Sequence, residues 1–148
     1  MTTSQRREVA AALIIDTRGR FLLQQRDDIP GILFPGKIGL FGGHREGEET
    51  FLECAVREVH EEISYFIAAE HFEHLASFRG PDPYIAGGIL CRELYVVRDV
   101  PVELLKVTEG TLFVAEMKDV PALVPRLAPS AHDAIRIFLT GAGGAGNE

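Results

Sequence analysis

The chain has 148 residues, of which 46% are hydrophobic and 25% are charged, a length that suits one compact domain better than two. Its 15 lysines and arginines stand against 22 acidic residues, which gives a formal net charge of −7. This balance excludes a broad basic surface for a nucleic-acid backbone, so an anionic ligand would need a metal ion or a local cluster of arginines.

The cysteines and the apolar runs favour a cytoplasmic protein without a membrane-spanning segment. Cys54 and Cys91 are too few for a disulfide framework and are not spaced as a metal-ligand pair, so we expect reduced thiols. The apolar run 9–15 is far shorter than the roughly 20 residues that cross a membrane. We expect a single domain over residues 1–148, with flexible ends at about 1–7 and 141–148.

The first half of the chain predicts a hairpin, a long connection and a helix. Residues 9–15 and 21–25 are apolar runs on either side of a polar turn, which is typical of a β-hairpin. Residues 27–48 contain six glycines and two prolines, so we expect an irregular connection, and long connections are often functional. Over residues 49–63, apolar side chains recur every three or four positions and form one stripe of a helix.

The second half predicts further strands and a terminal helix. Residues 71–78 and 89–97 are expected to be strands, and the second is expected to be central because it is apolar on both faces. Short strands are also expected at 102–106 and 111–114. Residues 130–138 show helical spacing of apolar side chains, so a last helix should pack across the sheet.

The predicted helix 49–63 carries three glutamates on one ridge. With Glu58 as the origin, Glu62 lies about 40° away and Glu61 about 60° away on the other side. Like charges at this spacing repel by a few tenths of a kcal/mol, whereas Mg²⁺ prefers oxygen ligands and commonly bridges carboxylates to phosphates. The ridge alone favours a solvated surface over a metal site, but Gly42 and Gly43 would permit close approach of a ligand.

The combined spacing reverses that preference. Gly43 is followed after five residues by Glu49, and after seven more by the run Arg57-Glu58-Val59-His60-Glu61-Glu62. This pattern resembles the Nudix box and matches every charged position of it. The end of the box differs, because Ser64 stands in place of the usual glycine and Tyr65 in place of an aliphatic residue. A left-handed helix end would cost Ser64 about 1 kcal/mol.

The resemblance implies an α/β/α sandwich with a mixed central sheet, of the α/β (α+β) class. It also implies metal-dependent hydrolysis of a phosphoanhydride bond in a nucleoside diphosphate linked to another group. Nucleotide sugars, ADP-ribose and nucleoside triphosphates are the open alternatives for this substrate. The implied cofactor is Mg²⁺, for which Mn²⁺ can substitute.

The resemblance also assigns roles to the box residues. The implied catalytic residues are Arg57, Glu58, Glu61 and Glu62. The three glutamates would ligate the metal, Glu61 directly or through water, and the carbonyl of Gly43 would join them. Arg57 would orient this cluster, and Glu49 would support it from behind. The candidates for the general base are, in order, Glu61, Glu109 and Glu103.

Substrate contacts lie outside the box, where the sequence is less informative. Arg26, Arg45 and Arg79 flank the predicted site and are candidates for charge-assisted hydrogen bonds to phosphate. Phe34 and Phe41 are candidates for enclosing a base or a sugar. The simpler alternatives are surface arginines and ordinary packing aromatics.

Three histidines and one proline give weaker signals. His44 could donate to a phosphate oxygen. His71 and His74 would face opposite sides of the strand expected at 71–78, which argues against a metal-ligand pair. Pro81, 16 residues after Tyr65, is similar in position to a proline of family members that hydrolyse ADP-ribose, although it also fits an ordinary turn.

Two other functions share this architecture. A non-catalytic Nudix-like domain could sense a nucleotide or bind a protein, and a metal-dependent isoprenyl diphosphate isomerase would need an added catalytic cysteine and acid. The intact acidic positions favour hydrolysis. The expected partner is a small nucleotide, with no stable nucleic-acid binding and no membrane, and the family suggests a homodimer.

Overall fold

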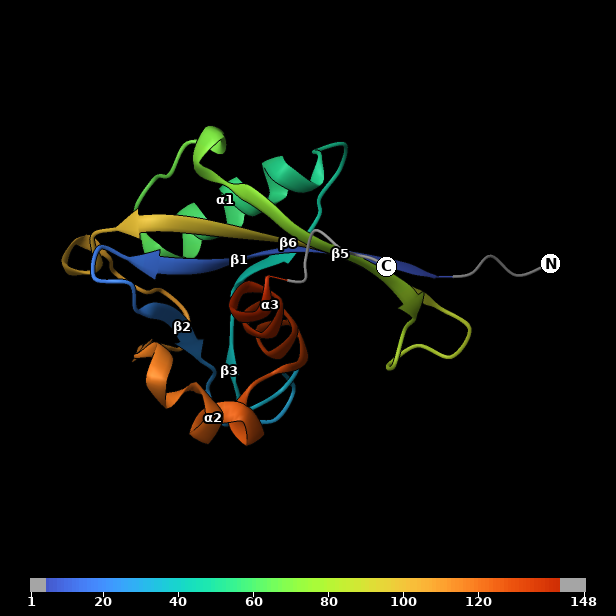
Figure 1. The fold of residues 1–148 in the computed structure, drawn as a ribbon. Helices are drawn as coiled ribbons and strands as arrows, with labels where there is room; N and C mark the ends of the chain where they lie inside the picture. Colours follow the sequence, from blue (N-terminus) through green and yellow to red (C-terminus); the bar gives the residue numbers. More distant parts are fainter. Residues whose placement is uncertain (1–4, 142–148) are drawn as a thin grey trace.

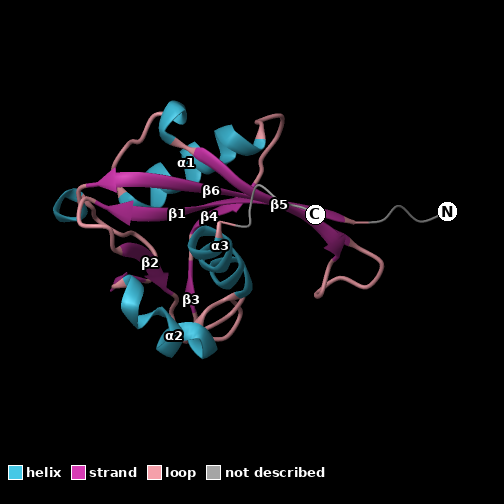
Figure 2. Cartoon of the chain, in the orientation of Figure 1, coloured by secondary structure: helices cyan, strands magenta, loops and turns pink. Residues whose placement is uncertain are grey.

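Within residues 5–141, which the computed structural model describes, seven strands form one mixed sheet (Figures 1 and 2). Strands β1 (Arg6–Asp16) and β2 (Phe21–Gln25) form the predicted hairpin. β1 also pairs in parallel with β6 (Ile89–Val100), whose other side pairs antiparallel with β5 (Glu73–Pro81). The order β3-β2-β1-β6-β5 places β6 inside the sheet, as its apolar sequence predicts.

Three short strands complete the sheet. β7 (Thr111–Ala115) pairs with β2 close to its predicted position. β3 (Ile38–Gly39) also pairs with β2, and β4 (Phe41–His44) pairs with β1. The prediction of an irregular connection over 27–48 was therefore wrong at its end. Glycine is depleted in strands, so the two glycines of β4 hide it in the sequence. The strand forms because it pairs antiparallel with β1.

Helices cover both faces of the sheet. Figure 1 shows α1 (Phe51–Ile63) and α3 (Pro129–Thr140) on opposite sides of the strands, which is the predicted α/β/α sandwich. Thr50 begins α1 with a capping box: its side chain accepts from the Glu53 amide, and the Glu53 carboxylate accepts from the Thr50 amide. The short helices are α2 (Val120–Leu123) and the 3-10 turns Ala69–His71, Val102–Leu104, Met117–Asp119 and Val124–Arg126.

The apolar character of β1 follows from burial on both of its faces. Leu13 belongs to the core cluster that contains the buried residues of α3. Ile14 belongs to the cluster that contains the buried residues of α1, including Val59 and Ile63. Successive side chains of a strand point to opposite faces, so β1 is apolar at every position from Val9 to Ile15 and packs both layers against one backbone.

Residues of two segments that we predicted to be strands lie in 3-10 turns. Residues 102–106 contain a 3-10 turn instead of a strand, because the Lys106 amide donates to the carbonyl of Ile63 at the end of α1. His71 precedes β5, since the amides of His71 and Phe72 close a 3-10 turn on Ala68 and Ala69. His71 and His74 therefore do not share a strand.

The ends that we predicted to be flexible, about 1–7 and 141–148, include a few residues that the structure describes. Arg6 and Arg7 lie in β1, opposite Ile89 and Leu90 of β6. The rest of that prediction concerns residues 1–4 and 142–148, which lie outside the described residues, except for Gly141 at the end of α3. None of the helices in the described part of the chain has the length and apolar character to cross a membrane.

Candidate active site

A cavity of about 700 Å³ lies against the sheet beside the acidic ridge of α1. Its walls come from β1, β4, β5, β6, the start of α3 and the loops that follow β2 and β5. The polar and charged side chains that line it are Arg7, Arg26, His44, Glu46, Glu58, Glu62, Arg79, Tyr84, Arg92, Glu109 and Ser130. The cavity thus joins the carboxylates of the predicted box to arginines from several elements.

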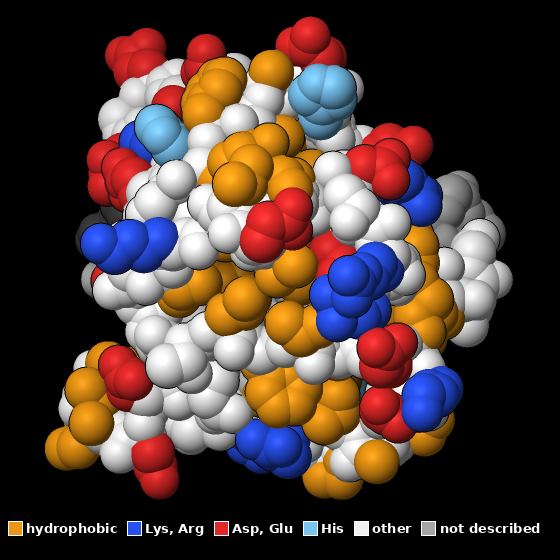
Figure 3. Space-filling view, turned by 90° about the vertical axis from the view of Figure 1, so that its left-hand side faces the viewer, with side chains coloured by type: hydrophobic (Ala, Val, Ile, Leu, Met, Phe, Trp, Pro, Cys, Tyr) orange, Lys and Arg blue, Asp and Glu red, His pale blue; other side chains and the backbone are white. Residues whose placement is uncertain are grey.

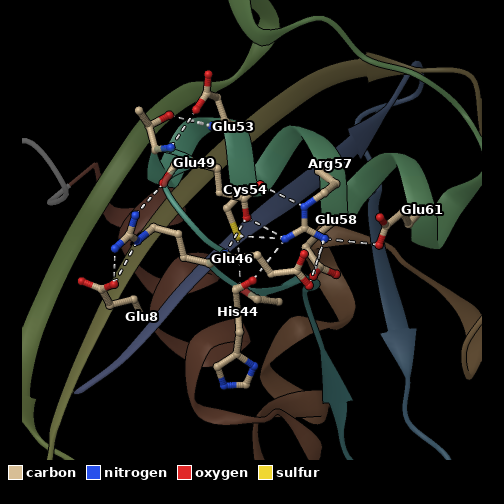
Figure 4. A network of polar contacts seen from close by, with 12 residues as sticks. Glu8, His44, Glu46, Glu49, Glu53, Cys54, Arg57, Glu58 and Glu61 are labelled. Carbon is tan, nitrogen blue, oxygen red and sulfur yellow. Dashed lines mark hydrogen bonds and ion pairs between the residues drawn. The ribbon is translucent and has the colours of Figure 1, made fainter. Parts of the chain in front are cut away.

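Arg57 holds the acidic residues of the box together (Figure 4). Its guanidinium donates to both carboxylate oxygens of Glu49, at 2.7 and 3.0 Å, to Glu58 at 3.1 Å and to Glu61 at 3.4 Å. A further bond of 3.2 Å reaches the carbonyl of His44. The hydrogen bonds from Arg57 lower the pKa of Glu49 to about 2. The bidentate pair fixes the guanidinium, so that it can orient Glu58.

Gly43 allows α1, and Gly42 allows β1, to approach β4 very closely. A Cβ atom on residue 43 would overlap the carboxylate of Glu58, and one on residue 42 would overlap the backbone of Ala10 in β1. The amide of Gly42 donates to Glu62 at 3.0 Å. Both carboxylates therefore lie directly against the backbone of β4, which explains why the box begins with glycine.

Burial disfavours the charged forms of Glu58 and Glu62 and raises the pKa of both carboxyl groups. Burial is the largest cause that raises the pKa of Glu62 to about 8, and the charges of Glu58 and Glu109 add to it, against the Gly42 amide and Arg26. The pKa of Glu58 is also raised, mainly by burial, although Arg57 lowers it. Two desolvated carboxylates with too little positive charge nearby form a site where a cation would be favourable.

The cavity offers few protein ligands for a divalent metal. Within residues 5–141, no three His, Cys, Asp or Glu side chains form a group that could hold a metal ion by themselves. The half-buried Glu58 and the buried Glu62 nevertheless offer two carboxylates to the cavity. Mg²⁺ is commonly bound through one or two carboxylates together with waters and substrate phosphates. The residues present fit such an ion.

Glu61 does not reach the cavity. Its side chain is 58% exposed and touches Arg57 on the outer side of α1. The rotation of a helix explains this position, because Glu61 and Glu62 differ by about 100° around the axis. The structure thus brings Glu58 and Glu62 together in the cavity and leaves the third predicted ligand outside it.

The loop that carries Glu109 is attached to the end of α1. The Thr108 amide donates to the carbonyl of Glu62 at 3.0 Å, and its hydroxyl donates to the carbonyl of Glu61 at 3.1 Å. The buried amide of Gln24 donates to the carbonyl of Glu109 at 3.0 Å. These bonds hold Glu109 at the cavity wall. The other late candidate for the general base, Glu103, lies in a 3-10 turn and does not line the cavity.

The predicted substrate contacts divide into two groups. Arg26 and Arg79 line the cavity. Arg45 instead binds Glu8 at 2.6 Å and the carbonyl of Glu49 at 2.6 Å, outside the cavity lining. Phe41 is fully buried in the core beneath α1, so the prediction that it contacts substrate was wrong. Its register opposite Ala12 of β1 directs the ring into that layer.

The sequence did not predict two other arginines of the cavity wall, Arg7 and Arg92. Arg7 binds Asp82 at 2.6 Å and lies 3.5 Å from His44. Arg92 stacks on Phe78 with 4.3 Å between the guanidinium carbon and the ring centroid. Their approach depends on the pairing of β1 with β6 and of β6 with β5, and one sequence gives no signal for that strand order.

The fold is an α/β/α sandwich whose acidic helix, α1, borders a ligand-sized cavity. A NUDIX domain model matches residues 5–135, so the chain belongs to the Nudix family. At this level it is a Nudix hydrolase, and Nudix hydrolases generally use divalent metals such as Mg²⁺ and act on small nucleotides. No individual curated protein matches the sequence.

Several solved structures share the fold at low sequence identity. The MutT protein from Methanosarcina mazei Go1 has a TM-score of 0.75 at 18% identity, covering 95% of this chain and 98% of that one. The dihydroneopterin triphosphate pyrophosphohydrolase of E. coli has a TM-score of 0.69 at 19% identity, covering 95% and 100%. The Francisella tularensis bifunctional NMN adenylyltransferase/ADP ribose pyrophosphatase, complexed with AMP and a Mn ion, has a TM-score of 0.71 at 18% identity, covering 97% and 44%.

Proposed function

We propose that the protein hydrolyses a phosphoanhydride bond in a nucleoside diphosphate linked to another group, with Mg²⁺ as cofactor and Mn²⁺ able to replace it. The observation that carries this proposal is the pair of carboxylates, the half-buried Glu58 and the buried Glu62, on the wall of a cavity that also contains arginines. A cation would neutralise the glutamates of the cavity, and a phosphate group would neutralise its arginines.

Glu58, Glu62 and the carbonyl of Gly43 are the groups that would hold the metal. When bound, such an ion withdraws charge from phosphoryl oxygens and makes water a better nucleophile. The two hydrogen bonds from Arg57 to Glu49 fix the guanidinium of Arg57. Its hydrogen bond to Glu58 then keeps the Glu58 carboxylate directed at the cavity. Glu61 would act only indirectly, through its contact with Arg57.

The chemical step is attack by water on phosphorus, with cleavage of the bond from phosphorus to the bridging oxygen. We assign the proton of that water to the carboxylate of Glu109, which lines the cavity and is held by Gln24 and Thr108. Glu61 was the first candidate for this role, but its exposed side chain faces away from the cavity. Arg26 and Arg79 would bind the substrate phosphates.

The substrate class follows from the size and chemistry of the cavity. About 700 Å³ is enough for a nucleotide with a second moiety. Two similar folds belong to proteins described as an ADP ribose pyrophosphatase and a dihydroneopterin triphosphate pyrophosphohydrolase. Pro81, the residue with a weak resemblance to ADP-ribose hydrolases, lines the same cavity. ADP-ribose, nucleotide sugars and nucleoside triphosphates therefore form the test panel.

Three further expectations stay predictions from the sequence. They are the cytoplasmic location, the homodimer and the lack of stable nucleic-acid binding. On the face shown in Figure 3, lysine and arginine side chains form small groups among acidic ones, without a continuous basic surface. This pattern is in keeping with the net charge of −7.

The deciding experiment measures phosphate-containing products from that panel with Mg²⁺ or Mn²⁺. It compares the natural protein with Glu58→Gln and Glu62→Gln, and with Glu70→Gln as a control for an exposed carboxylate outside the cavity. We expect metal-dependent turnover that falls about 100- to 1,000-fold in the first two variants and is unchanged in the control. Tight nucleotide binding without turnover by folded natural protein would favour a sensing domain, and an isomerised product would favour an isomerase.

A further inference from the structure

Two loops meet through a pair of aromatic side chains at the edge of the cavity. Phe34 lies in the loop after β2, and Tyr84 lies in the loop between β5 and β6. The two ring centroids are 5.7 Å apart and the rings are inclined at 75°, an edge-to-face contact. Both residues line the cavity, and Tyr84 is 54% exposed. Neither belongs to the two core clusters of the described residues.

The backbone of Phe34 itself has an unfavourable conformation. Phe34 has a φ of +51°, which is uncommon for a bulky residue. The conformation is held by the bond from Arg26 Nε to the carbonyl of Leu33 at 2.7 Å and by the bond from the Lys37 amide to the carbonyl of Phe34 at 3.2 Å. Such strain persists where the surrounding structure enforces it, often at ligand-binding positions.

The loop of Tyr84 is anchored by a buried ion pair. The Asp82 side chain is fully buried and accepts from Arg7 at 2.6 and 3.1 Å. The same carboxylate accepts from the Tyr84 amide at 2.8 Å. Tyr84 is therefore exposed at its ring but fixed at its backbone, which suits a side chain that contacts a ligand.

Each loop is linked to the acidic end of the cavity by an arginine. Arg26, which holds the loop of Phe34, lines the cavity together with Glu62. Arg7, which holds the loop of Tyr84, lies 3.5 Å from His44 at the end of β4. Carboxylates, arginines and aromatic rings thus line one cavity. A metal-bound nucleotide offers a complementary group to each of them: the metal, the phosphates and a planar base.

We infer that Phe34 and Tyr84 form a base-binding pair that stacks on the planar ring of a nucleotide and gives the enzyme its preference for nucleotides over base-free phosphates. This inference rests on the proposed function for the identity of the ligand. The guanidinium of Arg7 lies over the Tyr84 ring at 5.9 Å from its centroid. An edge-to-face pair still leaves at least one ring face outside these contacts, so a base can stack without separation of the loops. Stacking of a base on an aromatic side chain strengthens binding roughly 5- to 150-fold.

The test compares binding of AMP, GMP, CMP and UMP with binding of ribose 5-phosphate, which lacks only the base. Titration calorimetry without metal measures binding alone, so no turnover is needed. The variants are Phe34→Ala and Tyr84→Ala, with Tyr84→Phe to keep the ring. Phe66→Ala is the matched control, since Phe66 is 60% exposed and lies outside the cavity lining.

We expect at least one nucleotide to bind about 10-fold more tightly than ribose 5-phosphate, and each alanine variant to lose that difference while ribose 5-phosphate binds as before. Tyr84→Phe and Phe66→Ala should keep it. An equal loss for both ligands, or no preference for a base in the natural protein, would overturn the inference. Hydrolysis that persists without base preference rejects the pair alone, whereas base-dependent binding without hydrolysis rejects only the proposed activity.

Discussion

The carboxylate of Glu58 occupies the space that a Cβ atom on residue 43 would need. The glycine that opens the box therefore has a steric role, in addition to the carbonyl that it can offer to a metal. Any side chain at this position must push the Glu58 carboxylate away from β4 or push α1 away from the sheet.

We predict that Gly43→Ala lowers kcat about 100-fold, because the displaced carboxylate no longer faces the cavity. Overpacking should also destabilise the fold by about 1–3 kcal/mol. Steady-state kinetics and urea unfolding measure the two effects. Gly19→Ala is the control: its φ of +81° makes alanine unfavourable in the β1–β2 turn, far from the cavity lining. It should lose stability but keep kcat, and a similar loss of kcat in both variants would refute the steric explanation.

Glu62 should make the stability of the metal-free protein fall as pH rises. Burial raises its pKa from 4.5 to about 8, so between these values the folded state holds a proton that the unfolded state has released. The free energy of unfolding then decreases with pH across this window. In Glu62→Gln this contribution is absent, and the variant should be more stable than the natural protein near pH 8 by on the order of 1–3 kcal/mol.

Urea unfolding in EDTA from about pH 5 to pH 8 measures this difference. Glu70→Gln, at an exposed position, should follow the natural protein throughout. Added Mg²⁺ should remove the advantage of Glu62→Gln, because an ion that binds only the folded state stabilises it. Parallel pH profiles for the natural protein and Glu62→Gln would contradict the buried-carboxylate explanation.

Ser64 ends α1 in the left-handed conformation, with φ +56° and ψ +36°. Ser64→Gly should stabilise the protein by about 0.5–1 kcal/mol, since glycine adopts this conformation without a Cβ clash. The bond from the residue 64 amide to the carbonyl of His60 is kept. Ser64→Ala should bring no gain. Thermal unfolding with saturating Mg²⁺ measures the change, and an equal gain in both variants would point to the hydroxyl instead of the backbone.

Glu109 and Glu103 provide a matched pair for the general base. Glu109→Gln should lower kcat by about 100-fold or more with little change in KM, because the carboxamide cannot accept the proton of the attacking water. Glu103→Gln removes an exposed carboxylate from the neighbouring 3-10 turn and should leave both constants unchanged. Full activity in Glu109→Gln would return the role to another group.

The sequence predicted the parts of the molecule that depend on local pattern. The apolar stripe of α1 and its acidic ridge need only helical geometry, and Glu58 and Glu62 do lie together in the cavity. The hairpin of β1 and β2, the central position of β6 and the last helix also follow from local alternation or spacing. The box spacing, matched residue by residue, identified the family.

Features created by contacts between distant segments could not be predicted. Phe41 enters the core only because β4 pairs with β1, and a glycine-rich segment gives no hint of that pairing. Arg7 and Asp82 are 75 positions apart and meet because β1, β6 and β5 are neighbours. Glu61 and Glu62 are adjacent in sequence, yet only Glu62 faces the cavity, because the position of β4 selects one side of the ridge.

The capping box at Thr50 also determines where the chain tolerates a change in length. With the start of α1 fixed there, one residue inserted between Glu58 and Glu62 would rotate Glu62 by about 100° relative to Glu58. The loops of Phe34 and Tyr84 lie outside this constraint, and surface loops lengthen at little thermodynamic cost. Insertions and deletions in those loops can therefore alter which molecule is held, while the hydrolytic centre keeps its register.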